Sequence, residues 1–288
     1  MAVILGGNTS IYLGAPPAPP APVSDPDAQA FLTAAAITNP TIRTAVNQLV
    51  IDLKAYGIWT KMKAIYPFVG GTASTHKFNL KNPLDTDAAF RLTFFGGWIH
   101  SATGAKPNGT NAYAETYFLP SVELTTNYGS AHYYSRTTDS EITIGDNNGI
   151  VMGARANAAN DTFALTIKTN PSNFTNFFFS ATGTTTNQLA RYIDPTGTGF
   201  YSGSLFATNS KIYRNGVNLT TSNFSYTRNS PNIMIYIGAI NNKNTGPLDF
   251  TLKESALAAI GDSLTDTENA NYNLAVTAFE TTLGRNVW

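Results

Sequence analysis

The stretch KIYRNGVNLT, residues 211–220, carries the sharpest local structural signal in the chain. A two-residue type I′ turn needs positive φ at both central residues, and Asn215 followed by Gly216 adopts these angles with little strain. The stretch therefore predicts two antiparallel strands joined by a tight hairpin. Apolar residues stand on both sides of the turn: Ile212, Tyr213, Val217 and Leu219.

The composition indicates a folded chain with a neutral polar surface. Charged residues make up 12% of the 288 residues, about half of the usual share of roughly 25%, whereas hydrophobic residues reach 42%. The net charge is zero, and the sequence has no cluster of Lys and Arg that could bind along a phosphate backbone. Both features argue against a nucleic-acid partner. No apolar run approaches the roughly 18 to 20 residues that span a bilayer, so no membrane insertion is predicted.

From Met62 to about Ile260, short strand-like runs alternate with clusters of turn residues. Many short strands at roughly even spacing are typical of a sandwich or jelly roll. We expect a mainly β fold, an antiparallel β-sandwich. The expected strands lie in residues 62–69, 75–80, 90–100, 122–126, 131–137, 141–145, 150–155, 163–168, 174–181, 199–206, 211–214, 233–240 and 250–261.

Helical patterns flank the strand region. Ser24 or Asp25 can cap a first helix that runs to about Ile37, and Asn39 with Pro40 opens a second helix that Gly57 ends. Near the end of the chain, residues 265–268 read Thr-Asp-Thr-Glu, a capping box, and Gly284 stands where a left-handed residue closes a helix. A C-terminal helix is therefore predicted between them.

Residues 1–28 are expected to form an extended leader. The run APPAPPAPVSDP, residues 15–26, favours a semi-rigid polyproline II spacer. Apolar residues before this spacer are predicted to dock on another molecule by adding to a sheet or a groove. The predicted organisation is thus a leader at 1–28, a helical section at 29–58 and a sandwich with its C-terminal helix at 59–288. The docking residues are Val3, Ile4, Leu5, Ile11, Tyr12 and Leu13.

One aromatic cluster suggests contact with sugars, because sugar sites often combine an aromatic ring with neutral hydrogen-bonding groups. The cluster consists of Tyr128, His132, Tyr133 and Tyr134, in or beside one expected strand. Strand alternation places His132 and Tyr134 on one face and Tyr133 on the other, so about half of the cluster is expected in the core. Trp98 and residues 177–179 are predicted to be core aromatics.

The sequence shows no catalytic, cofactor or metal motif. A glycan hydrolase needs a pair of carboxyl groups, and the run from Asp139 to Asp146 lacks a second acid on the face of Glu141. Glu115, Glu123 and Glu254 also lack a near acidic partner. The absence of cysteine excludes disulfides and thiolate metal sites.

The three histidines and one Asp-Asn-Asn triplet are the remaining candidates for metal ligands in the sequence. The three histidines, His76, His100 and His132, are far apart in the sequence, so they are expected to be surface or hydrogen-bonded strand residues. Residues 146–148, Asp-Asn-Asn, have the oxygen ligands that calcium prefers, although such a triplet more often forms a turn.

The last third of the chain resembles a concanavalin A-like, laminin-G-like sandwich. The resemblance covers residues 205–285, where a hairpin with an Asn-Gly turn, a strand broken by Gly, a further strand and a helix opened by a capping box follow in order. It implies a concanavalin A-like jelly roll with a lectin-like surface.

Two other segments, residues 52–94 and 269–287, resemble a module of tailed-bacteriophage structural proteins. That resemblance implies a non-enzymatic head-fibre, decoration or tail-accessory protein. Such a protein is made in the host cytoplasm and displayed on the particle exterior, where it can contact host glycans weakly. It implies other virion proteins (capsid, portal or tail) as partners of the leader, and a homo-oligomer. The alternatives are a free lectin-like carbohydrate-binding module and, as a weaker alternative, a glycan hydrolase.

Overall fold

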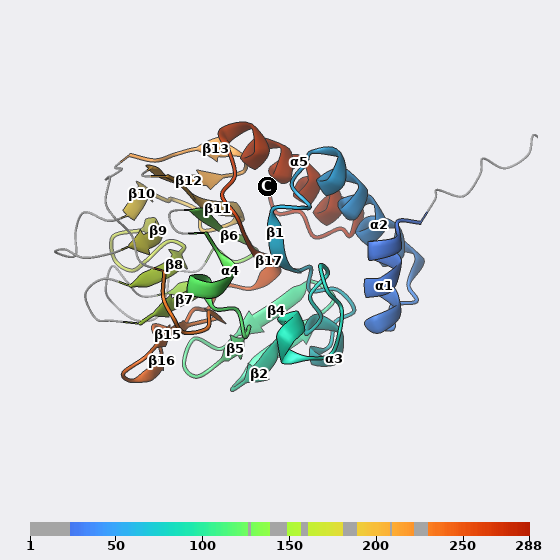
Figure 1. The fold of residues 1–288 in the computed structure, drawn as a ribbon, viewed down its shortest axis with the longest axis horizontal. Coiled ribbons are helices and arrows are strands. Elements are labelled where there is room, and N and C mark those ends of the chain that lie inside the picture. Colours follow the sequence, from blue (N-terminus) through green and yellow to red (C-terminus); the bar gives the residue numbers. More distant parts are fainter. Residues whose placement is uncertain are drawn as a thin grey trace, which may run out of the picture.

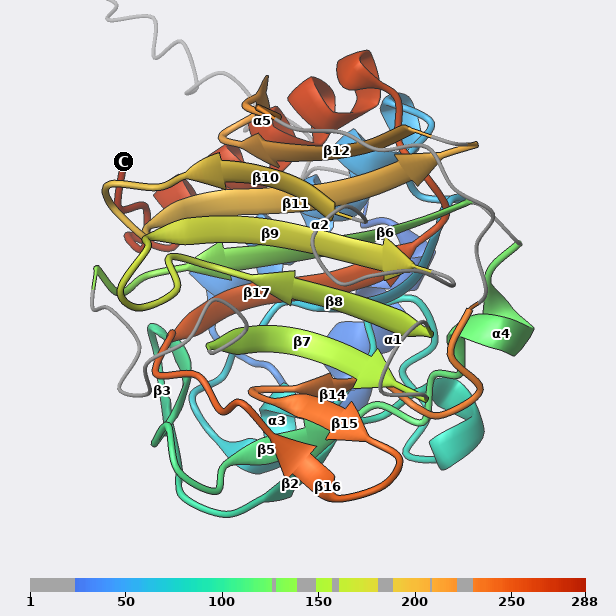
Figure 2. The same cartoon turned by 90° about the vertical axis from the view of Figure 1, so that its left-hand side faces the viewer.

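A computed structural model describes residues 24–125, 128–138, 149–156, 161–180, 189–207, 209–221 and 230–288. These residues form two β-sheets that face each other, with helices on the outer side of one sheet (Figure 1, Figure 2). The predicted mainly β sandwich is confirmed. The predicted docking residues Val3, Ile4, Leu5, Ile11, Tyr12 and Leu13 lie outside the described residues, as do Asp139, Glu141, the strand predicted at 141–145 and residues 146–148.

The first sheet has the order β13-β12-β11-β6-β17-β4-β3, and β1 also pairs with β17. All of its pairs are antiparallel. Its strands are β1 (Met62–Tyr66), β3 (Trp98–Ser101), β4 (Gly104–Pro107), β6 (Tyr128–Ser135), β11 (Gly199–Phe206), β12 (Asn209–Arg214), β13 (Val217–Asn218) and β17 (Ser255–Gly261).

The second sheet has the order β10-β9-β8-β7-β14-β5-β2. Its pairs are antiparallel except that β15 runs parallel to β7. Its strands are β2 (Thr93–Phe95), β5 (Tyr113–Glu115), β7 (Ile150–Arg155), β8 (Thr162–Thr166), β9 (Phe174–Ser180), β10 (Leu189–Ile193), β14 (Tyr236–Ile237), β15 (Ile240–Asn242) and β16 (Gly246–Leu248).

The hairpin predicted at residues 211–220 is confirmed. Asn215 has φ 52° and Gly216 has φ 76°, and Arg214 pairs with Val217 across the two-residue turn. The side-chain Oδ1 of Asn215 also accepts a hydrogen bond from the backbone N–H of Phe200 on the neighbouring strand, at 2.9 Å. The turn is thus fixed to β11 as well as to its own two strands.

The space between the sheets is filled by a core of aromatic and aliphatic side chains. Phe163, Phe177 and Phe179 of the second sheet pack edge-on or tilted against one another and are buried. The facing strand β11 has Gly203 opposite Phe177, and a Cβ at this glycine would lie 2.2 Å from the Phe177 ring. The ring therefore fits only because residue 203 has no side chain. Trp98 packs against the same core.

Helices α1 (Pro26–Ala34), α2 (Pro40–Ala55) and α5 (Asp266–Thr282) cover the outer side of the first sheet (Figure 1). The predicted caps are present: Asp25 accepts from the N–H of Asp27, and Asn39 accepts from that of Ile42. Thr265 and Glu268 form the predicted capping box. Helix α2 packs against α5, and both share a second core with the sheet, so the first sheet is buried on both faces.

Two strand predictions are wrong. The segments expected as strands at 75–80 and 122–126 instead begin inside the short helices α3 (Ala73–His76) and α4 (Pro120–Glu123). A capping box between Thr72 and Thr75 starts α3, and Pro120 stands in the first turn of α4, where its missing N–H has no helical partner to lose. A 3₁₀ turn, η1 (Asp87–Ala89), follows α3. In the described part of the chain, none of the helices combines the length and apolar character that crossing a membrane requires.

Candidate ligand-binding site

The candidate site arises where the helical layer stops covering the first sheet. Residues with even numbers on β6 and β11 point to the helices, so Tyr134, His132 and Phe200 lie under α5 and are buried. Helix α5 begins at Asp266, two residues after Leu264, whose backbone is hydrogen-bonded to Ser204 of β11. Phe206, two residues further along the same face, lies beyond the N-terminal end of α5 and is 50% exposed. A pocket forms at this end.

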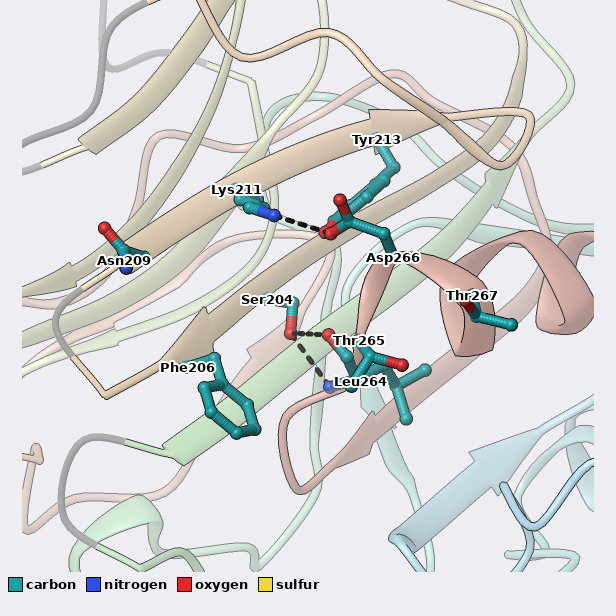
Figure 3. A pocket seen from close by; sticks show the side chains of 9 residues that line it. All are labelled: Ser204, Phe206, Asn209, Lys211, Tyr213, Leu264, Thr265, Asp266 and Thr267. Carbon is teal, nitrogen blue, oxygen red and sulfur yellow. Dashed lines mark hydrogen bonds and ion pairs between the residues drawn. The ribbon is translucent and has the colours of Figure 1, made fainter.

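The pocket has a volume of about 360 Å³ and lies between the β11–β12 hairpin and the first turn of α5 (Figure 3). One wall comes from the hairpin strands and the other from the segment that leads into the helix. The lining residues are Ser204, Phe206, Asn209, Lys211, Tyr213, Leu264, Thr265, Asp266 and Thr267.

An ion pair crosses the pocket from one wall to the other. Lys211 Nζ of β12 lies 2.6 Å from Asp266 Oδ1 of α5, and the Tyr213 hydroxyl donates to the same oxygen at 2.7 Å (Figure 3). The hydrogen bonds from Lys211 and Tyr213 lower the pKa of Asp266, so this carboxyl stays ionised at neutral pH. Burial, together with the Asp266 charge, raises the pKa of Tyr213, which stays a neutral donor.

Hydrogen bonds to the sheet hold the start of α5 in place. Ser204 Oγ donates to Leu264 O at 3.0 Å and accepts from Leu264 N at 2.9 Å. Ser202 donates its hydroxyl hydrogen to Asn269 Oδ1, and the Asn269 amide in turn donates to Leu264 O at 3.1 Å. Since Ser202, Ser204 and Asn269 are buried, the pocket walls are preorganised.

Phe206 supplies an aromatic surface at the mouth of the pocket. Its ring packs edge-to-face with Tyr128 of β6, with centroids 5.2 Å apart and an interplanar angle of 82°. Tyr128 is paired with Phe206 across the strands and is half-buried. The contact supports the ring of Phe206 while half of that residue remains exposed.

The structure corrects most of the predicted sugar-contact cluster. His132, Tyr133 and Tyr134 are fully buried, so they are core residues and present no surface to a ligand. Tyr133 lies on the face opposite His132 and Tyr134, as the alternation predicted, and faces the sandwich core, whereas the other face is covered by helices. Tyr128 alone of the four lies beside the candidate site, through Phe206.

Two of the histidines, distant in sequence, are in contact. His76 Nδ1 lies 2.9 Å from His100 Nδ1, and His76 Nε2 accepts a hydrogen bond from Gly71 N at 3.2 Å. His76 therefore carries its proton on Nδ1 and donates to His100. Within the described part of the chain, no group of three or more His, Asp or Glu side chains has an arrangement that would hold a metal ion.

Phe206, Lys211 and Asp266 were not predicted as site residues from the sequence. Each belongs to an element that was predicted, but their meeting depends on where α5 starts above the sheet. Alternation along β11 and β12 puts Phe206 and Lys211 on one face, and the capping box locates Asp266 in the first helical turn. The sequence contains both of these signals, but it does not show how the helix packs on that face of the sheet.

No protein-family model and no curated protein matches the sequence. Among solved structures, the chain is similar to domain 4 of AbnA, an extracellular GH43 arabinanase from Geobacillus stearothermophilus, solved in complex with arabinotriose. The identity is 15% and the TM-score is 0.49, and the match covers 74% of this chain and 98% of that one. A Trypanosoma rangeli sialidase mutant with trans-sialidase activity is similar at 11% identity and a TM-score of 0.46, covering 81% and 39%. The CBM40 of a Ruminococcus gnavus IT-sialidase is similar at 13% identity and a TM-score of 0.35, covering 51% and 82%. Likenesses this distant assign neither a ligand nor an activity to the chain.

Proposed function

We propose that this chain is a non-catalytic carbohydrate-binding β-sandwich whose ligand site is the pocket at the start of α5. The observation that carries the proposal is Phe206, an exposed ring beside a preorganised polar pocket. Sugars present a C–H face that packs on aromatic rings and hydroxyl groups that need fixed hydrogen-bond partners. Phe206 offers the first kind of contact, and Lys211, Asp266 and the residues around them offer the second.

The carboxyl groups favour binding over hydrolysis. Glycan hydrolysis by the usual mechanism needs two carboxyl groups about 5 to 10 Å apart on either side of the scissile bond. Among the described residues that line the pocket, Asp266 is the one carboxylate. Its pairing with Lys211 and Tyr213 keeps it ionised, whereas a general acid must hold a proton near neutral pH.

Glycan-array screening of the purified protein, followed by calorimetry on the best ligand, tests the proposal. The Phe206→Ala variant should bind about fivefold more weakly or worse, since stacking on an aromatic ring is worth about 1 kcal/mol or more. Phe95→Ala is the matched control, because Phe95 is a 38% exposed phenylalanine on the edge strand of the other sheet. Absence of any saturable saccharide binding would overturn the proposal.

A second proposal concerns where the module is displayed: a virion structural protein, docked by its leader. The segments 52–94 and 269–287, which carry the resemblance to bacteriophage proteins, are brought together in the fold. Arg285 donates hydrogen bonds to the backbone oxygens of Phe68 and Pro67, at 2.9 and 3.3 Å, so the two segments form one unit. This contact supports the interpretation that both segments belong to one module of the bacteriophage type.

Deletion of residues 1–22 tests the docking role separately from sugar binding. The truncated chain should fold and keep its saccharide affinity, because the described core begins after these residues. It should also fail to incorporate into particles when it replaces the full chain during assembly. Incorporation at normal copy number would contradict leader docking and leave the carbohydrate proposal standing.

A further inference from the structure

The charges of the candidate pocket cancel within the pocket itself. Among the nine described residues that line it, Lys211 and Asp266 are the charged ones, and their charged atoms lie 2.6 Å apart. Their side chains remain 35% and 61% exposed, so a ligand can reach both. The site therefore offers one strong donor and one strong acceptor side by side, with no net charge.

Both partners have hydrogen-bonding capacity beyond their mutual contact. An ammonium group has three N–H donors, and the pair uses one of them. On Asp266, Oδ1 receives both Lys211 and Tyr213, and no hydrogen bond from a described residue reaches Oδ2. A sugar hydroxyl can donate and accept at once, so two neighbouring hydroxyls match this donor and acceptor together.

Tyr213 holds the Asp266 carboxylate in place, so another anion does not displace it from the pocket. The Tyr213 side chain is 1% exposed and its hydroxyl donates to Asp266 at 2.7 Å. Displacing the carboxylate would leave this buried hydroxyl without its acceptor, at a cost of about 1 to 3 kcal/mol. An incoming carboxylate would therefore have to sit beside Asp266, whose repulsion, roughly 1 to 4 kcal/mol for like charges about 4 Å apart near a protein surface, offsets the attraction of Lys211. The carboxylate would lose its hydration without a net attraction in return.

We propose that the pocket selects neutral sugars and rejects acidic ones, with Asp266 as the residue that sets this specificity. This inference rests on the carbohydrate-binding function proposed above. A vicinal diol of the sugar lies between Asp266 Oδ2 and Lys211 Nζ, and the C–H face of the ring packs on Phe206. Uronic acids and other carboxylated sugars are excluded by the Asp266 charge.

The test compares neutral oligosaccharides of hexoses and pentoses with uronic-acid oligosaccharides of the same linkage, by calorimetry at low ionic strength. The wild-type protein should bind the neutral member of a pair at least tenfold more tightly. Asp266→Asn keeps an acceptor for Tyr213 but removes the charge, so it should bind the uronic acid at least tenfold better than wild type and the neutral sugar more weakly.

Two controls separate charge in the pocket from charge elsewhere. Asp262→Asn removes a carboxylate that pairs with Lys63 at 3.2 Å outside the pocket, so it should leave the selectivity unchanged. Lys211→Met should weaken neutral binding without admitting uronic acids, because Asp266 then stands without its cation.

The failures of the two proposals are distinguishable. If wild type binds uronic acids as tightly as neutral sugars, or if folded Asp266→Asn keeps the wild-type selectivity, the specificity inference is overturned and the binding function stands. If wild type binds neither set, the proposed function fails, and the inference that rests on it fails too.

Discussion

The carboxylate of Glu280 and the guanidinium of Arg285 form a two-pronged ion pair in the interior, with N–O distances of 2.8 and 2.9 Å. The side chains are 0% and 2% exposed. Arg285 also donates to the backbone oxygens of Phe68, Pro67 and Ala256. One side chain therefore joins the end of α5 to the segment after β1 and to β17.

Arg285→Ala should destabilise the fold by about 3–5 kcal/mol, because it leaves the Glu280 carboxylate buried without its partner. The measurement is the free energy of unfolding from urea titration. Asp87→Ala is the control, since Asp87 is 56% exposed in its pair with Arg91 and should contribute less than about 1 kcal/mol. Similar losses in the two variants would contradict the structural role of Arg285.

Acid should destabilise the protein between pH 6.5 and pH 3. Burial lowers the pKa of His132 to about 3, and burial with the neighbouring His100 and Arg285 lowers that of His76 to about 3. Below its ordinary value of about 6.5 each histidine binds a proton in the unfolded chain but not in the fold, so the fold loses stability as pH falls. At pH 5 the loss is about 2 kcal/mol for each histidine.

Unfolding titrations at pH 7.5 and pH 5.0 measure this loss. In His132→Gln the difference between the two pH values should shrink by about 2 kcal/mol, the share of that histidine, whatever the variant does to stability at neutral pH. A wild-type free energy that is the same at both pH values would show that these histidines are not held neutral by the fold.

Gly216→Ala should be more destabilising than Gly246→Ala. Both glycines have positive φ, 76° and 81°, so a side chain at either costs roughly 1–2 kcal/mol of backbone strain. A Cβ at Gly216 would also lie 3.1 Å from Asn273 Cβ of α5, whereas one at Gly246 meets nothing within 4 Å. Thermal unfolding of the two variants measures the difference, and equal losses would mean that the hairpin turn does not pack on α5.

Gly203→Ala should loosen the contact between the two sheets. Its Cβ would lie 2.2 Å from the Phe177 ring, an overlap that neighbouring strands must move to relieve, at about 1–3 kcal/mol or more. Phe177→Leu in the same chain should recover part of this loss, because the shorter side chain leaves room. A double variant whose loss equals the sum of the single losses would contradict the direct contact.

Local chemistry in the sequence predicted much of the fold. The Asn215–Gly216 turn, the caps at Asp25 and Asn39 and the capping box at Thr265 depend on residues within a few positions of each other, and all are present. The wrong strands at 75–80 and 122–126 have the same origin, because short apolar runs do not distinguish a strand from a helical turn.

The candidate site depended on long-range packing and was harder to predict. Alternation assigned the faces of His132 and Tyr133 correctly but gave no sign that helices cover the outer face of the sheet. Phe206 and Asp266 are sixty positions apart, and their proximity follows from where α5 starts above β11. The contact of His76 with His100 likewise needed the three-dimensional fold.

The most direct test of carbohydrate binding is an NMR titration of the isotope-labelled protein with the neutral oligosaccharide that binds best. Backbone shifts should concentrate at Ser204, Phe206, Lys211 and residues 265–267, and should saturate with the affinity that calorimetry gives. Shifts centred on Phe95 and Tyr113 of the other sheet, or no saturable shifts at any sugar concentration, would contradict a binding site at the start of α5.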